Sequence, residues 1–170
     1  RWNKSGYILK LRNGFYTFPE YNSVPSFHEY IANKIYSPSY ISLHYALSHY
    51  ELIPEAIFQV TSVSSLKTIN FNNSFGTFTY QKIKPGLMFG YQCRPFLNLA
   101  INLATPEKAI LDLFYLFPFY QTEQNMIDLR FDRQVLEEIF NKKLFYKYLE
   151  KFQNKQLNKR IDTFIKTYNL

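Results

Sequence analysis

The chain has 170 residues, of which 46% are hydrophobic, and it contains 15 tyrosines and 17 phenylalanines. This composition is too apolar for a disordered segment, and the length suits one domain with a core of its own. No apolar run approaches the roughly 20 residues that cross a bilayer, and the basic start lacks the apolar stretch of a signal peptide. A single cysteine, Cys93, and three scattered histidines offer no disulfide and no metal cluster, so we expect a cytoplasmic protein without cofactor or metal.

Positive charge is concentrated at the two ends of the chain. The net charge of +7 divides into +4 for residues 1–13, −2 for the centre and +5 from Arg133 onward. Such segregation is a typical electrostatic signature of contact with phosphate backbones, although a solvated basic helix face gives the same pattern.

The first predicted element is a β-hairpin with a basic outer face. Apolar and basic residues alternate from Tyr7 to Arg12, and Asn13-Gly14 suits the two positive-φ positions of a type I′ turn before a return strand over 15–18. An isolated hairpin is marginally stable, and the sequence shows no obvious neighbour for it. Residues 19–25 are expected to form a linker.

Two short helices and a series of strands are predicted next. Ser26 and Glu29 fit a capping box for a helix to about Ile35, and an apolar stripe predicts a second helix over 42–51. Period-two patterns then predict strands over 57–62, 67–72, 77–83, 87–92 and 97–103, the last with four apolar residues on its covered face (Leu97, Leu99, Ile101 and Leu103). Cys93 is expected to be a buried small hydrophobe.

Helices close the chain. Thr105-Pro106-Glu107 provides a cap, a proline at the first helical position and an acid at the N-terminus, which predicts a buried central helix to about Phe117. From Asp132 onward two or three amphipathic helices are expected. The outline is an α+β fold with a mixed or antiparallel sheet, a hairpin at its start and a helical tail.

Two groups of charged residues leave alternatives open. Lys108 and Asp112 are spaced to form an ion pair on the helix that Glu107 begins, and the same three residues could instead belong to a metal site of a nucleic-acid-processing enzyme. Four lysines recur every four residues and form either a solvated helix face or a track for phosphates (Lys143, Lys147, Lys151 and Lys155).

Several motifs, in order from Tyr40 to Leu116, resemble those of the AbiEi-type antitoxin and transcriptional regulator family of abortive-infection phage defence. They are "SYISL" with a later "AL" and "LIPE", then "VTS", "GTFTY" and "PEKAILDL". The family-motif residues Tyr40, Ser42, Glu107, Lys108 and Asp112 are expected to be structural.

This resemblance implies a cytoplasmic, non-enzymatic bacterial protein. It implies an N-terminal winged helix-turn-helix that binds the protein's own promoter and an α+β antitoxin domain. It also implies a type IV toxin partner, similar to a nucleotidyltransferase, that need not be bound directly.

The hairpin is similar to the family's wing. Gly6, Gly14 and Tyr16 match the wing pattern together with the basic residues of the first strand, while Trp2 and Lys4 would end the recognition helix. We therefore expect residues 1–20 to be the remnant of a winged helix and residues 24–170 to be the antitoxin domain. The expected DNA-binding residues are Arg1, Lys4, Lys10, Arg12 and Asn13.

The helices that would read the major groove are missing from these 170 residues, so the hairpin alone is expected to contact phosphates or the minor groove. Two other functions stay open from the sequence. One is a metal-dependent enzyme acting on nucleic acid, and the other is a protein-interaction module that uses the aromatic-rich tail.

Overall fold

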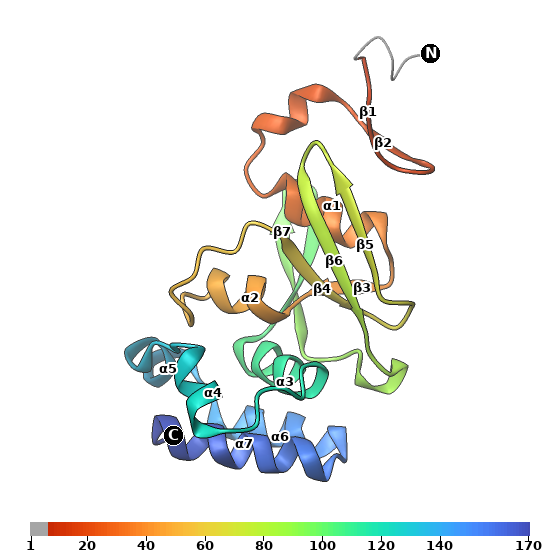
Figure 1. Ribbon diagram of the computed structural model, residues 1–170. Coiled ribbons are helices and arrows are strands. Elements are labelled where there is room, and N and C mark those ends of the chain that lie inside the picture. The colour runs from red at the N-terminus through yellow and green to blue at the C-terminus, as the bar shows by residue number, and fades with distance from the viewer. Residues whose placement is uncertain (1–6) are drawn as a thin grey trace.

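A computed structural model describes residues 7–170 and shows a mixed α+β fold (Figure 1). A two-stranded hairpin lies at one end, a six-stranded sheet occupies the middle, and a layer of helices forms the other end. The strands are β1 Leu9–Arg12, β2 Phe15–Thr17, β3 Ser39–Ile41, β4 Val60–Ser64, β5 Ile69–Asn73, β6 Gly76–Lys82, β7 Tyr91–Phe96 and β8 Leu99–Ala104. The α-helices are α1 Phe27–Ile35, α2 Leu43–His49, α3 Pro106–Leu116, α4 Glu123–Asp128, α5 Arg133–Ile139, α6 Lys142–Phe152 and α7 Lys155–Tyr168.

The central sheet is mixed, as the sequence predicts. Its strand order is β5-β6-β4-β3-β8-β7. The pairs β4–β6 and β3–β8 are parallel, while β3–β4, β5–β6 and β7–β8 are antiparallel. The short strand β3 was not predicted, yet it lies at the centre of the sheet with all three residues buried.

Helix α1 packs on β3, β4 and β8, and a hydrogen bond from the Tyr80 hydroxyl to the Ala32 carbonyl (2.6 Å) joins it to β6. Helix α3 contacts α2, α6 and α7 and so joins the sheet to the helical layer. It begins as predicted: the Thr105 hydroxyl accepts a hydrogen bond from the Lys108 amide (3.3 Å), and every residue from Glu107 to Phe114 is buried. The predicted central buried helix is therefore confirmed.

The capping box predicted for α1 is wrong. Ser26 has a φ of 61° and its side chain makes no capping hydrogen bond. Glu29 turns instead toward the sheet, where its carboxylate pairs with Arg94 and accepts a hydrogen bond from the Tyr45 hydroxyl (3.0 Å). A long-range ion pair at this buried position replaces the local cap.

Strands β7 and β8 differ from their predicted pattern. Residues 85–87 form a short 3-10 helix, and β7 begins only at Tyr91. Because β7 is an edge strand, Cys93 is exposed rather than buried. Leu97 and Leu99, at 70% and 47% exposed, lie at the turn between the two strands, so only Ile101 and Leu103 of the predicted apolar face are covered.

None of the helices within residues 7–170 combines the length and apolar character needed to cross a bilayer.

Candidate nucleic-acid interface

The hairpin has its packing partner within this chain, contrary to the expectation from sequence. Strand β1 contacts β5, the edge strand of the central sheet. Leu11 is buried there, and its carbonyl accepts a hydrogen bond from the Asn73 side chain (3.1 Å). The hairpin is therefore held on the α+β domain by both apolar burial and a hydrogen bond.

A β-bulge in β1 changes the direction of Arg12. Lys10 pairs with Tyr16, but the next pair joins Arg12 to Phe15, which leaves Leu11 as the extra residue. A bulge shifts the alternation of side chains along a strand. Arg12, expected on the exposed basic face with Lys10, is therefore half-buried against the domain.

Aromatic rings surround the Arg12 guanidinium. Its carbon lies 4.7 Å from the ring centroid of Phe15, 5.2 Å from that of Phe71 and 5.9 Å from that of Tyr36. Tyr36 is itself fixed by hydrogen bonds between its hydroxyl and the backbone of Lys67 (3.0 and 3.1 Å). Stacking of this kind holds a guanidinium in place through its faces and leaves the N–H groups on its edge available.

The edge of this guanidinium has no hydrogen-bond or ion-pair partner among residues 7–170. Five N–H donors on a half-buried, oriented group favour an external acceptor, and a phosphate accepts from such a fork through two oxygens.

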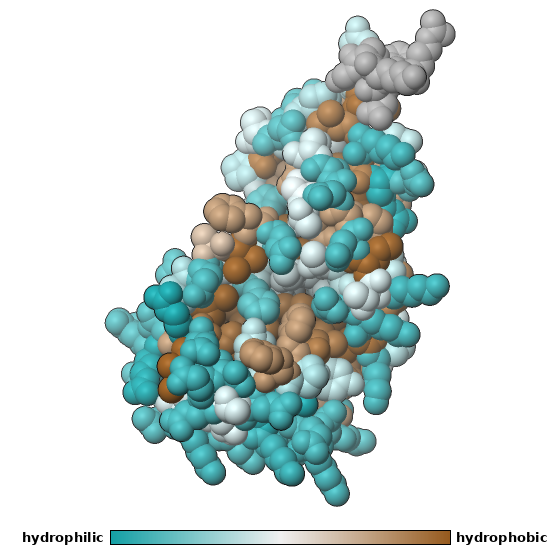
Figure 2. Space-filling view, in the orientation of Figure 1, coloured by the Kyte–Doolittle hydropathy of each residue, from teal (hydrophilic) through white to brown (hydrophobic). Residues whose placement is uncertain are grey.

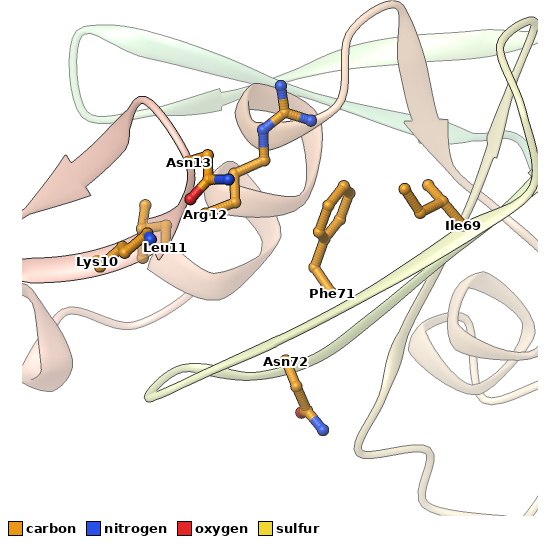
Figure 3. Close-up of a pocket in the computed structure, with 7 residues that line it drawn as sticks. All are labelled: Lys10, Leu11, Arg12, Asn13, Ile69, Phe71 and Asn72. Atoms are coloured by element: carbon orange, nitrogen blue, oxygen red, sulfur yellow. The ribbon is translucent and has the colours of Figure 1, made fainter.

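A groove of about 500 Å³ lies between the hairpin and β5 (Figure 3). It is lined by Lys10, Leu11, Arg12, Asn13, Ile69, Phe71 and Asn72. In the close-up, Phe71 and Ile69 project from the same side of β5, whereas Asn72 projects from the other. The lining contains two cations, two side-chain amides and no acid, so the groove suits an anion.

The structure brings together three of the five residues expected to bind DNA. Lys10, Arg12 and Asn13 share the groove, while Arg1 and Lys4 lie outside the described residues. The expected type I′ turn is wrong, because only Gly14 has a positive φ (82°) and Asn13 does not. Sequence reasoning missed Phe71, Tyr36 and Asn73, which hold the hairpin, because no local pattern connects them to it.

The family-motif residues form a second, buried cluster around Asp112. Its carboxylate accepts hydrogen bonds from the Tyr40 and Ser42 hydroxyls, each at 2.9 Å, and pairs with the Lys108 ammonium. Lys108 also donates to the Tyr40 oxygen at 2.8 Å. All four residues have essentially no exposed surface. Residues about 70 positions apart thus complete one polar network.

Burial controls the titration of this cluster. It lowers the pKa of Lys108 and raises the pKa of Asp112, because each charged form loses its hydration, and the attraction between the two opposes both shifts. Burial and the neighbouring Asp112 raise the pKa of Tyr40 as well. The rings of Phe89 and Phe152, whose centroids lie 4.9 and 5.0 Å from the Lys108 nitrogen, close the site to solvent.

Glu107 is engaged elsewhere. Its carboxylate is buried and accepts a hydrogen bond from the Asn141 amide (2.8 Å), which ties the start of α3 to the loop before α6. Among residues 7–170, no group of three or more histidine, cysteine or acidic side chains is arranged to hold a metal ion. Glu107 therefore does not share the network of Lys108 and Asp112, and the ion pair allowed by the spacing of those two residues is confirmed.

The four lysines of the tail do not form one continuous stripe. Lys143, Lys147 and Lys151 lie on α6, but the helix ends at Gln153, where φ is 45°, and Asn154 then caps α7. Lys155 therefore belongs to a separate helix. Lys151 lies over the Phe89 ring, 4.5 Å from its centroid, whereas the other three are exposed without such a contact.

No family model, curated protein or solved structure matches this chain significantly.

Proposed function

We propose that this chain acts as a non-enzymatic antitoxin that also regulates its own promoter, with the hairpin acting as a DNA-binding wing. One observation carries the proposal: the guanidinium of Arg12 is oriented by three aromatic rings, lacks a partner within residues 7–170, and borders a groove that contains Lys10 and Asn13 but no acid. These residues supply phosphate contacts that place the protein on a duplex, and helices preceding the wing read the bases.

The buried cluster supports the same proposal in a different way. The motifs that carry the resemblance to AbiEi-type antitoxins supply Tyr40, Ser42, Lys108 and Asp112, and these residues meet in one network. A shared structural nucleus explains why the motifs occur together in one order. In this proposal the cluster supports the antitoxin domain and takes no part in chemistry, because both acids of the proposed metal alternative, Glu107 and Asp112, are buried and engaged.

Promoter binding is tested with the natural full-length protein and the DNA directly upstream of its gene. Replacing both Lys10 and Arg12 with Gln is expected to weaken binding and to reduce the slope of log K against log salt by about 1.8, since each phosphate contact contributes about 0.9. The matched control replaces Lys82 and Lys84, which are exposed on and just after β6. Unchanged binding by the hairpin variant would refute the role of the wing.

The antitoxin role is tested by co-expression with the product of the adjacent gene. We expect this protein to restore growth to cells that the neighbour poisons, and we expect rescue to survive the Lys10 and Arg12 replacements because it resides in the second domain. Absence of rescue by the natural protein would overturn the antitoxin proposal and leave the DNA-binding result unaffected.

A further inference from the structure

The outer sides of the last two helices carry two rows of lysines. In α6 the buried residues are Phe145, Leu149 and Phe152, and in α7 they are Leu157, Ile161, Phe164 and Tyr168. At 100° per residue, the positions opposite these buried stripes are Lys143 and Lys147 on α6 and Lys155, Lys159 and Lys166 on α7. All five lysines are exposed.

The two rows lie at the same end of the molecule (Figure 1). Both helices pack on α3, and each turns the side opposite its buried stripe away from the core. Figure 2 shows hydrophilic residues covering this end of the molecule. From residue 142 onward the acids are Glu150 and Asp162, which are exposed on the same sides of the helices as the lysines, three residues after Lys147 and Lys159. None of the five lysines forms an ion pair with them or with any other acid within residues 7–170.

Two of the five lysines, Lys143 and Lys155, lie in first turns, where the helix dipole disfavours a cation, whereas Lys166 lies in the last turn of α7, where the dipole favours one. The first turns of α6 and α7 contain no acid, and Lys142, Lys143 and Lys155 occupy them instead. The first turns of α3 and α4 carry Glu107 and Glu123, as the helix dipole favours.

We propose that this lysine face, formed by Lys143, Lys147, Lys155, Lys159 and Lys166, binds the phosphate backbone of duplex DNA without reading its sequence. The face lies at the opposite end of the molecule from the hairpin (Figure 1). Together with the proposed function of the hairpin, on which this step rests, the lysine face gives one chain two separate phosphate-binding surfaces that can hold two DNA segments. Binding by the lysine face itself does not rest on the hairpin.

The aromatic side chains argue for a duplex over other occupants. Proteins that bind single strands offer exposed aromatic rings on which bases stack, and protein interfaces need apolar anchors. Within residues 142–170, the exposed large hydrophobic residue is Tyr146, at 38% exposed. The other large aromatics of these helices are buried or half-buried. A surface of lysines with so little apolar area suits a backbone of regularly spaced phosphates.

The test uses a variant in which Lys143, Lys147, Lys155 and Lys159 become Gln. The control replaces Lys34, Lys67, Lys82 and Lys84, which removes the same charge from exposed positions elsewhere. Binding of a 20-base-pair duplex of arbitrary sequence is followed by fluorescence anisotropy at several salt concentrations. The tail variant is expected to bind at least tenfold more weakly at low salt, with a slope reduced by about 3 to 4, since each contact contributes about 0.9. The control is expected to change less than threefold.

Equal losses in the two variants would overturn the proposal, as would binding to an RNA duplex or a single strand in preference to DNA. The phosphate contacts proposed for the hairpin are also independent of sequence, so the Lys10 and Arg12 double variant is measured on the same duplex to separate the two surfaces. Capture of a labelled duplex by beads carrying a second duplex measures bridging. Unchanged capture by the tail variant would refute the two-segment conclusion.

Discussion

Lys108 and Asp112 lie one turn apart on α3 and form an ion pair that has no exposed surface. The hydroxyls of Tyr40 and Ser42 also donate hydrogen bonds to the carboxylate of Asp112, so both charges of the pair are compensated. Removing one partner leaves the other charge buried and unpaired. We expect Asp112→Ala to lower the free energy of unfolding by about 3–5 kcal/mol in urea titrations.

The double replacement of Lys108 and Asp112 by Met and Leu should recover part of this loss, because no buried charge is then left unpaired, while the Tyr40 and Ser42 hydroxyls still lack their acceptor. The exposed pair of Arg130 and Glu55 (3.5 Å) is the control, since Glu55→Ala should change stability by less than about 1 kcal/mol. A small effect of Asp112→Ala would mean that the ion pair does not hold this core together.

Gly90 makes a second testable contact with the same lysine. It has a φ of 73°, and a Cβ atom there would lie 3.0 Å from Cγ of Lys108 and 3.0 Å from a ring carbon of Tyr148. We expect Gly90→Ala to reduce stability by at least about 1–3 kcal/mol, the range for a strained backbone alone. At Gly86 nothing lies within 4 Å of the added carbon, so Gly86→Ala should be nearly neutral in the same unfolding assay.

The docking of the hairpin can be measured by hydrogen exchange. Arg12→Gln removes the cation from its aromatic surroundings, and amides of β1 and β2 should exchange about two- to fivefold faster, corresponding to about 0.5–1 kcal/mol. Lys10→Gln, on the same strand but exposed, should leave their protection unchanged. Equal effects of the two replacements would show that the aromatic contacts do not hold the hairpin.

Three histidines should make the fold sensitive to acid. Burial lowers the pKa of His28, His44 and His49 below the ordinary value of 6.5. As the pH falls, the histidines of the unfolded chain are protonated before those of the folded protein, and this favours unfolding. The stability that the neutral histidines contribute is therefore complete above pH 6.5 and is lost as the pH falls from 6.5 toward their pKa values in the folded protein. Unfolding free energies measured between pH 8 and pH 5 should decline, and His44→Asn should make the decline shallower.

The start of α7 should gain stability from an acid. Lys155 is its first residue, where a positive charge opposes the helix dipole. Lys155→Glu should raise the free energy of unfolding by about 0.3–1 kcal/mol more than Lys159→Glu, which lies beyond the first turn. Equal effects in thermal unfolding would assign the gain to net charge alone.

The sequence predicted those parts of the fold that are specified locally. The cap at Thr105 and the central helix were predicted correctly, because short-range hydrogen bonds and periodicity determine them. The hairpin predicted over 7–18 is observed over 9–17, with a turn other than the predicted type I′. Strand β3 was missed because three residues carry no measurable period, and its pairing depends on strands far along the chain.

The sites were predictable only in part. The spacing of Lys108 and Asp112 indicated an ion pair, but it did not predict complete burial, because charged residues are rarely fully buried. It also did not predict the partners Tyr40 and Ser42, which lie about 70 residues earlier in the sequence. The direction of Arg12 depends on a bulge and on β5. The break between α6 and α7 did have a local signal in Asn154, a strong capping residue, which the four-residue period of the lysines obscured.

The position of β3 also imposes an order on folding. It pairs in parallel with β8 through Ile41 and Leu103. The hydroxyls of Tyr40, within β3, and of Ser42, directly after it, donate hydrogen bonds to Asp112. Contacts of such long range form slowly, because the intervening loop must close first. During synthesis, a chain that ends before Asp112 leaves both hydroxyls without the carboxylate that binds them. We therefore expect most of this domain to have emerged from the ribosome before its sheet is complete. The β4–β6 segment, which emerges early, is then the part most exposed to aggregation.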